Sequence, residues 1–255
     1  MAPEPRVPID LHLHTALSPC AAGNMTPPPM LFTAEMRGLR VVGVVDHSSA
    51  GNARAVQEAA QAFALRALVG LEVESTEGVH LLALFDTAAA AERLEALVAA
   101  HQPPLRNRPD IFGEQLLVNE WGDVTGQEPR LLALATDWTV EEVADLTRQH
   151  GGLSIAAHVD RPGNGLLPIL GFVPPRLHVT ALEVSRFLPP AAARRRWPEL
   201  RSQPLLTGSD AHCLEEIGCG PTLIPVSLAE ADLPVADWGR ELAEFLRAET
   251  AAGDA

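Results

Sequence analysis

Short apolar runs that are typical of buried strands alternate with helix-like segments along most of the sequence. RVVGVVDH (residues 40–47) and ALVGLEV (residues 67–73) are continuous apolar runs, as expected of strands buried on both faces. A helix-like segment over residues 52–65 follows the first run, and one over residues 87–100 follows a further strand-like run, VHLLALF (residues 79–85). Repeated strand-then-helix units imply parallel strands, either in an open doubly wound sheet or in a closed barrel. The predicted fold class is therefore α/β.

Side chains that can bind metal or transfer protons lie at the ends of nearly every expected strand. They are His12, His14, Asp46, His47, Glu72, His158, Asp210 and His212. In a barrel the carboxyl ends of the strands converge on one mouth, whereas the outer strands of an open sheet would keep these groups too far apart. This placement favours a TIM-like barrel.

The length of 255 residues suits one large domain of this kind. Residues 101–137 interrupt the alternation with turn-rich stretches, HQPPLRNRP and NEWGDVTGQEP, which predict a hairpin insertion. We therefore expect residues 1–255 to form a single domain with an insertion at about 101–137.

Two pairs of candidate ligands share the same spacing. His12 and His14 lie two residues apart on an expected strand, so their side chains point the same way, about 6.5–7 Å apart, and can reach one ion. One such pair is equally consistent with two buried, hydrogen-bonded histidines. Asp210 and His212 repeat the spacing on a separate strand end, which favours metal binding.

The nine histidines fall into two groups. Six lie in or beside apolar strand segments, where an uncompensated polar ring is costly: His12, His14, His47, His80, His158 and His212. The others, His101, His150 and His178, lie in loops or near a helix end and are expected to be ordinary surface residues.

Five motifs together carry a family resemblance. DLHLHT, VVDH, the glutamate of GLEVES, AAHVDRP and GSDAH occur in the order found in the polymerase and histidinol phosphatase (PHP) superfamily, which the chain resembles over residues 10–212. The resemblance implies a distorted (β/α)7 TIM-like barrel that holds two or three divalent metal ions, usually zinc, manganese or iron. It also implies a metal-dependent phosphoesterase.

The resemblance assigns nine metal ligands: His12, His14, Cys20, His47, Glu72, His80, His158, Asp210 and His212. The first ion would take the first two histidines with Asp210 and Glu72, the second His80 and His158 with Glu72 as a bridge, and the third His47, His212 and a residue from the loop after the first strand. Family members commonly have His or Asp in that loop.

This chain departs from the family pattern in the same loop, which reads Ser18-Pro19-Cys20. Cys20 is the candidate ligand, and a thiolate would favour zinc over manganese. The alternative is that Cys20 is a small buried hydrophobic residue. Two further positions stay open: Asp46 either orients a ligand or caps a loop, and His80 begins its strand instead of ending it.

Two arginines are candidates for binding substrate. Arg161 follows His158 by three residues, and in several family members an arginine just after this histidine contacts substrate phosphate. The forked guanidinium group matches phosphate geometry. We therefore predict that Arg161 orients the substrate during catalysis, although an ordinary surface position is the alternative. Arg186 is a second candidate for anion binding.

These features predict a hydrolase that cleaves phosphoester bonds of a small phosphorylated metabolite or nucleotide by metal-activated hydroxide, as a phosphatase or nucleotidase. One alternative is an amidohydrolase-like enzyme that cleaves C–N or C–O bonds, but a chain without lysine cannot form the carboxylated-lysine bridge common in that class. The other alternative is a non-catalytic PHP module, which would be expected to have lost its ligands.

The composition suggests partners and location. The formal net charge of −14 leads us to expect no stable binding of duplex nucleic acid. The three cysteines are too few for a disulfide framework, and there is neither a signal segment nor an apolar run of membrane-spanning length. We therefore expect a cytoplasmic protein that does not bind membranes and acts on a small phosphorylated substrate.

Overall fold

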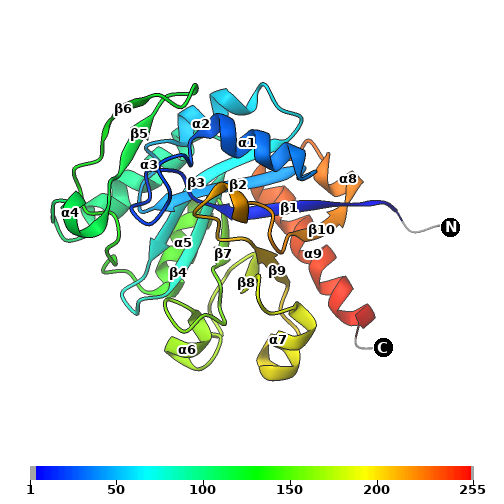
Figure 1. The fold of residues 1–255 in the computed structure, drawn as a ribbon. Helices are drawn as coiled ribbons and strands as arrows, with labels where there is room; N and C mark the ends of the chain where they lie inside the picture. The colour runs from blue at the N-terminus through cyan, green and yellow to red at the C-terminus, as the bar shows by residue number, and fades with distance from the viewer. Residues whose placement is uncertain (1–3, 254–255) are drawn as a thin grey trace.

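One mixed sheet forms the centre of the computed structural model, which describes residues 4–253 (Figure 1). Its strands are β1 (Arg6–Leu13), β2 (Val41–His47), β3 (Arg66–Glu74), β4 (His80–Phe85), β7 (Leu153–Ala156), β8 (Ala181–Ser185), β9 (Leu205–Gly208) and β10 (Thr222–Pro225). Their order is β10-β1-β2-β3-β4-β7-β8-β9. The helices surround the sheet in Figure 1: α1 (Pro27–Met36), α2 (Ala53–Ala60), α3 (Ala88–Ala100), α5 (Val140–Gln149), α6 (Leu166–Leu170), α7 (Pro190–Arg196), α8 (Val226–Ala229) and α9 (Val235–Gly253).

The sheet closes into a barrel just beyond the end of β9. Leu13 of β1 forms a parallel bridge with Ala211, and His14 N donates to Ala211 O over 3.0 Å. β10 pairs antiparallel with the first half of β1 and lies outside this ring. The remaining seven strands make the barrel, so the expected distorted (β/α)7 fold is confirmed.

Reversal of β4 distorts the barrel. β4 pairs antiparallel with both β3 and β7, whereas β1–β2, β2–β3, β7–β8 and β8–β9 are parallel. The first residue of β4, His80, is therefore opposite Glu74 at the end of β3. This explains why a histidine that begins its strand lies at the same rim as residues that end theirs.

Alternate residues of each strand face two different apolar clusters. In β2, Val42 and Val44 pack with the helix residues Met30 and Val56, whereas Val41 and Val45 pack in a cluster that includes Trp238 of α9. His47 continues the second set, because alternate strand residues face the same way. The barrel interior is thus apolar below and polar at the rim, where the carboxyl ends of the strands meet.

A bulge in β1 changes which residues face the interior. The β1–β2 register shifts between Asp10 and Leu13. Ile9 and Leu11 pack in the interior cluster, but Leu13 packs with the outer helices. A Cβ at Gly43 would lie 2.5 Å from the Leu11 carbonyl oxygen, so glycine provides the space for the bulge.

The helices follow the sequence closely. α5 begins with a capping box between Thr139 and Glu142. The segment expected as one helix over 52–65 is shorter, because α2 ends at Ala60 and the chain turns there toward β3. No helix in residues 4–253 is long and apolar enough to cross a membrane.

Residues between α3 and α5 form a short antiparallel pair, β5 (Leu116–Val118) with β6 (Val124–Gln127), preceded by α4 (Pro109–Phe112). Asn52 holds this pair in place: its amide donates to Leu116 O over 3.0 Å and its side-chain oxygen accepts from Val118 N over 2.9 Å. The same amide donates to Thr15 Oγ1 over 2.8 Å. The hairpin is thereby fixed to the loop that follows β1.

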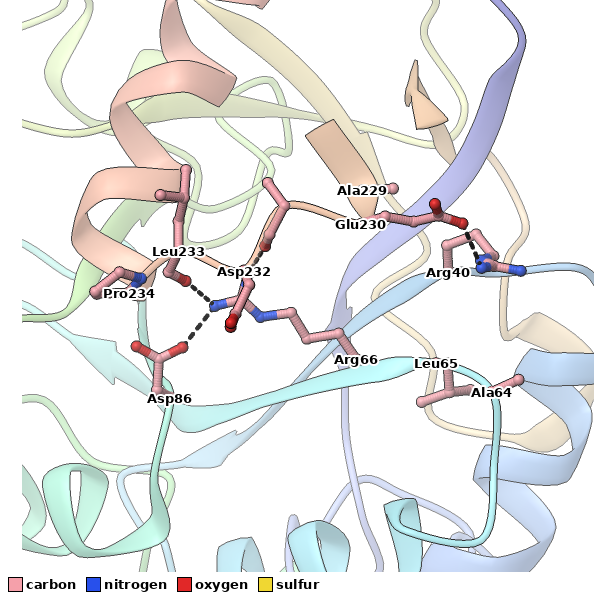
Figure 2. Close-up of a pocket in the computed structure, with 11 residues that line it drawn as sticks. Arg40, Ala64, Leu65, Arg66, Asp86, Ala229, Glu230, Asp232, Leu233 and Pro234 are labelled. Carbon is pink, nitrogen blue, oxygen red and sulfur yellow. Dashed lines mark hydrogen bonds and ion pairs between the residues drawn. The ribbon is translucent and has the colours of Figure 1, made fainter. Parts of the chain in front are cut away.

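The opposite end of the barrel is closed by the segment that joins α8 to α9. Arg66, at the start of β3, donates to Leu233 O and to Asp86 Oδ1 over 2.8 and 2.6 Å, as Figure 2 shows. A cavity of about 720 Å³ lies there. Its second arginine, Arg40, is paired with Glu230, so both guanidinium groups already have acidic partners (Figure 2).

Candidate metal centre

Four side chains bring donor atoms together at the carboxyl end of the barrel. The Nε2 atoms of His12 and His14 lie 3.1 Å apart, and each is 3.3 Å from Asp210 Oδ1. Glu72 approaches both rings, with Oε1 3.5 Å from His12 Nε2 and Oε2 3.4 Å from His14 Nε2. Three separate strands thus place their side chains around one point.

These spacings fit the coordination sphere of a metal ion. In a tetrahedral site with bonds of about 2.0–2.1 Å, the donor atoms lie roughly 3.3–3.4 Å apart. The five separations of 3.1–3.5 Å match that geometry. Imidazole and carboxylate together suit zinc, manganese and iron. The residues present therefore fit a divalent cation.

Glu72 also contacts a second set of donors. Its Oε2 lies 3.1 Å from His47 Nδ1, and its Oε1 lies 2.8 Å from His80 Nδ1 and 3.2 Å from His158 Nε2. Its side chain is only 1% exposed. Histidine nitrogens that can bind metal lie beside each of its two oxygens, so this buried carboxylate can bridge two ions.

The third predicted group differs from what the sequence suggested. The donor atoms of His14, His47 and His212 lie within 4.8 Å of one another, so His14 takes the place expected of Cys20. Cys20 belongs to none of the possible metal-binding groups found among the described residues. Desolvation and the charges of Glu72 and Asp210 raise the pKa of its thiol to about 12, although the residue is exposed. The three groups found among the described residues therefore form without Cys20.

Glu183 determines which nitrogen of His12 faces the cluster. Both carboxylate oxygens of Glu183 lie 3.1 Å from His12 Nδ1, and the side chain is fully buried. The carboxylate accepts a hydrogen bond from Nδ1–H, which leaves the lone pair on Nε2. Gly208 makes room for this contact, because a Cβ there would lie 2.8 Å from Glu183 Oε2.

A chain of hydrogen bonds fixes the tautomer of His14 in the same way. Ser18 Oγ donates to Asp46 Oδ1 over 2.7 Å and lies 2.9 Å from His14 Nδ1. Its single proton goes to Asp46, so Ser18 accepts from Nδ1–H and the lone pair of His14 is on Nε2. Thr15 donates to Asp46 through both its backbone and its hydroxyl group. Asp46 thus orients a histidine and does not itself face the cluster.

Burial and neighbouring charges shift the pKa values of the histidines in the cluster in opposite directions. Burial lowers the pKa of His14 to about 4 and that of His47 to about 3. Burial acts the same way on His80, but the charge of Glu72 outweighs it and raises the pKa of His80 to about 9. Glu183, Asp210 and Glu72 likewise hold the pKa of His12 well above its ordinary value. The carboxylates thus stabilise positive charge in the cluster, either on a protonated histidine or on a bound cation.

Binding of a divalent cation is expected to release protons and to become tighter as pH rises. With a pKa of about 9, His80 is protonated at neutral pH, whereas imidazole binds metal only in its neutral form. The competing proton is lost as the pH rises through about 9, where the gain in affinity should end. Zinc affinity measured by chelator competition from about pH 6.5 to 8.5 should therefore increase. His178→Gln, which replaces an exposed histidine that pairs with Asp145, should leave the slope unchanged. A constant affinity would contradict the expectation.

Replacing Glu183 tests its role in orienting His12. Glu183→Gln keeps the shape of the side chain but removes the charge that holds Nδ1–H, so zinc affinity is expected to fall by about 10- to 100-fold. Chelator competition measures the affinity, and circular dichroism checks that the barrel is folded. Glu244→Gln on the exposed face of α9 is the matched control. Equal affinities for both variants would show that Glu183 does not act through His12.

The backbone is in the left-handed region at two positions of the cluster. His158 has φ of 30° and Asp210 has φ of 50°. Non-glycine residues rarely adopt such angles, and those that do are concentrated at functional sites. His158 Nδ1 is also buried without a hydrogen-bond partner. Each residue lies two positions beyond the end of a short strand, β7 or β9, where the chain turns sharply at the rim.

A cavity of about 490 Å³ opens beside the donor cluster. Arg161 lies at its edge, half exposed, with Nη1 2.5 Å from Asp210 Oδ2. Arg186 also lines it, and this side chain donates to Ser209 O over 3.0 Å and to Glu216 Oε1 over 2.5 Å. The structure thus places both predicted anion-binding arginines beside the cluster, with Arg186 held more firmly.

Sequence reasoning did not single out Glu183. It lies within the apolar strand ALEVS, in the same Leu-Glu-Val context as Glu72 in GLEVES. A carboxylate in the middle of a buried strand is costly unless it is paired, and this cost is the signal that could have identified Glu183.

Asp10 is a second buried carboxylate, and it accepts hydrogen bonds from Ser209 N and Gly218 N over 3.0 and 2.8 Å. It joins the strand ends at the seam of the barrel.

Comparison with solved structures shows what this chain is similar to. It is similar to the lesion-specific endonuclease Q of Pyrococcus furiosus, with 19% identity and a TM-score of 0.55 over 82% of this chain and 49% of that chain. A protein from Bifidobacterium adolescentis assigned as a metal-dependent phosphoesterase gives 19% identity and a TM-score of 0.56, over 94% and 96%. An amidohydrolase from Chromobacterium violaceum gives 21% and 0.54, over 92% and 95%. At these identities the similarity shows the fold, and this chain spans about half the length of endonuclease Q.

One of these structures corrects the expectation about nucleic acid. Endonuclease Q has been crystallised with a 27-mer duplex that carries an abasic lesion at the active site (18% identity, TM-score 0.55, over 82% of this chain and 50% of that one). The expectation of no stable duplex binding is therefore wrong. It rested on the total charge of −14, which does not describe the local field at a mouth lined by arginines and able to hold cations.

The sequence itself identifies the family. The comparison with curated proteins gave no match. The family model described as the PHP domain matches residues 10–158, which run from within β1 to just past β7 and include the first six histidines and acids of the donor cluster along the chain. The chain belongs to the PHP domain family.

Proposed function

We propose that this protein is a metal-dependent phosphoesterase that removes phosphate from a nucleotide or another small phosphorylated metabolite. The observation that supports it best is the contact between Arg161 and Asp210. One oxygen of Asp210 lies 3.3 Å from the histidine nitrogens, while the other lies 2.5 Å from Arg161 Nη1. A guanidinium group is thereby held at the border between the donor cluster and the open cavity, where a phosphate group could contact both.

The donor sets suggest two or three ions of zinc, manganese or iron. His12, His14 and Asp210 would hold one ion, and Glu72 would connect it to another held with His47, His80 and His158. His212 lies in an overlapping group with His14 and His47, and this group would hold a third ion only where His14 Nε2 is not bound to the first, because one ring nitrogen binds one ion. Such ions lower the pKa of water and stabilise the negative charge that develops on phosphate oxygens.

The protein's own residues would bind and orient the substrate. Arg161 is half exposed and can turn its free N–H groups toward a phosphate oxygen, while Nη1 stays on Asp210. Glu183 keeps His12 in one tautomer and Ser18 does the same for His14, so no proton needs to move within those rings. Glu216 ties the rim together, because it accepts from both His212 N and Arg186 Nη2. We propose that residues 1–255 act as one catalytic unit.

Metal reconstitution with a substrate panel tests this proposal. The protein is treated with chelator, loaded separately with zinc, manganese or iron, and given phosphate monoesters and diesters beside amide and lactone substrates. Hydrolysis of phosphate esters that requires metal is the expected result. Turnover confined to amides or lactones would instead support the amidohydrolase alternative. A fully loaded protein that cleaves nothing in the panel would support a non-catalytic module.

A further inference from the structure

The β8–α7 loop presents an aromatic ring to the mouth of the active-site cavity. Phe187 is 81% exposed, the largest exposed fraction among the large apolar side chains in the described part of the chain. It lines the same cavity as Arg161, Asp210 and His158. Exposed apolar surface favours burial, and this ring can be buried by whatever enters the cavity.

Arg186, the residue before Phe187, packs against the ring and holds it in place. The Cζ atom of Arg186 lies 4.9 Å from the centre of the Phe187 ring. Arg186 is itself fixed by Ser209 O and Glu216, and its side chain is 19% exposed. Gly220 allows the close packing, since a Cβ there would lie 2.7 Å from Arg186 Cβ. A rigid guanidinium group thus supports the ring from one side.

We propose that Phe187, backed by Arg186, is the stacking platform for a nucleobase, so that the substrate joins a base to the phosphate group. This proposal rests on the proposed phosphoesterase function. An aromatic ring beside arginine binds the flat face of any base, because stacking and cation–π attraction require only a π surface. A sugar phosphate has no such surface and would leave the ring in water. The cavity of about 490 Å³ is large enough for a ligand that reaches from Asp210 to Phe187.

The base could belong to a free nucleotide or to a nucleic acid, and the two sources share the same recognition chemistry. The experiment therefore uses adenosine 5′-monophosphate, ribose 5-phosphate, and phosphorylated single-stranded and duplex oligonucleotides. Dissociation constants are measured by calorimetry on the metal-loaded protein, together with kcat/KM. The variants are Phe187→Ala and Phe187→Trp. Phe172→Ala is the control, since Phe172 is 54% exposed but does not line the cavity.

Phe187→Ala is expected to weaken binding of the base-bearing ligands by about tenfold, while ribose 5-phosphate changes less than about twofold. Phe187→Trp should restore the affinity. A larger loss for the oligonucleotides than for the mononucleotide would identify nucleic acid as the source of the base. An equal effect on ribose 5-phosphate, no effect on any ligand, or no preference of the unaltered protein for a base would overturn the stacking site. Base binding that depends on Phe187 without hydrolysis of any phosphate ester would refute the proposed function alone.

Discussion

Asp210→Asn is expected to lower kcat/KM for phosphate ester hydrolysis by about 10³-fold or more, equivalent to about 4 kcal/mol of transition-state stabilisation. Asp210 combines two roles, because Oδ1 faces His12 and His14 while Oδ2 holds Arg161. The substitution removes the negative charge from both contacts. Asparagine tolerates the left-handed φ of 50° at this position, so the loop should keep its conformation.

Steady-state kinetics and metal analysis of the purified variant measure this effect. Bound metal should fall together with activity, while thermal unfolding stays cooperative. Asp137→Asn is the matched control, because the Asp137 side chain is 72% exposed and pairs with His101 outside the cluster. Activity of the Asp210 variant within tenfold of the unaltered protein would exclude the proposed role.

Gly70→Ala is expected to destabilise the fold by about 3 kcal/mol or more. A Cβ at Gly70 would lie 1.7 Å from the carbonyl oxygen of Ala83 and 2.8 Å from its carbon, so the backbones of β3 and β4 would have to separate. These two strands carry Glu72 and His80, whose side chains meet over 2.8 Å. Moving the strands apart should therefore weaken metal binding as well as folding.

Urea unfolding of the metal-free and metal-loaded protein measures this change. Gly23→Ala serves as the control, because a Cβ there would meet nothing within 4 Å. Its unfolding free energy should stay within about 0.5 kcal/mol of the unaltered protein. If Gly70→Ala unfolds at the same urea concentration as Gly23→Ala, the two strands are not as closely packed as described.

The barrel could be predicted from local patterns because each strand has its own signal. Runs such as VVGVV within RVVGVVDH are apolar at every position, which a strand covered on both faces requires. The chemical groups also appear in the sequence at the ends of these runs. Their meeting could be anticipated only because parallel strands in a barrel bring their carboxyl ends to one mouth.

Several features of the site depend on neighbouring strands and have no local signal. The reversal of β4 places His80 beside Glu72, although His80 begins its strand. The bulge near Leu11 turns His12 and His14 into the barrel, and it requires a glycine in another strand. Cys20 was expected in the cluster from its position in a motif, but the three donor groups form without it.

The amino-acid sequence by itself determined the strand-and-helix order and the kinds of donor atoms available, because hydrophobic pattern and side-chain chemistry are local properties. The tertiary structure alone decided which donors share a site, which nitrogen each histidine presents, and that Phe187 faces the same cavity as Asp210. Those outcomes depend on distances between residues far apart in the chain. Such distances are fixed by strand direction, register and packing between different elements.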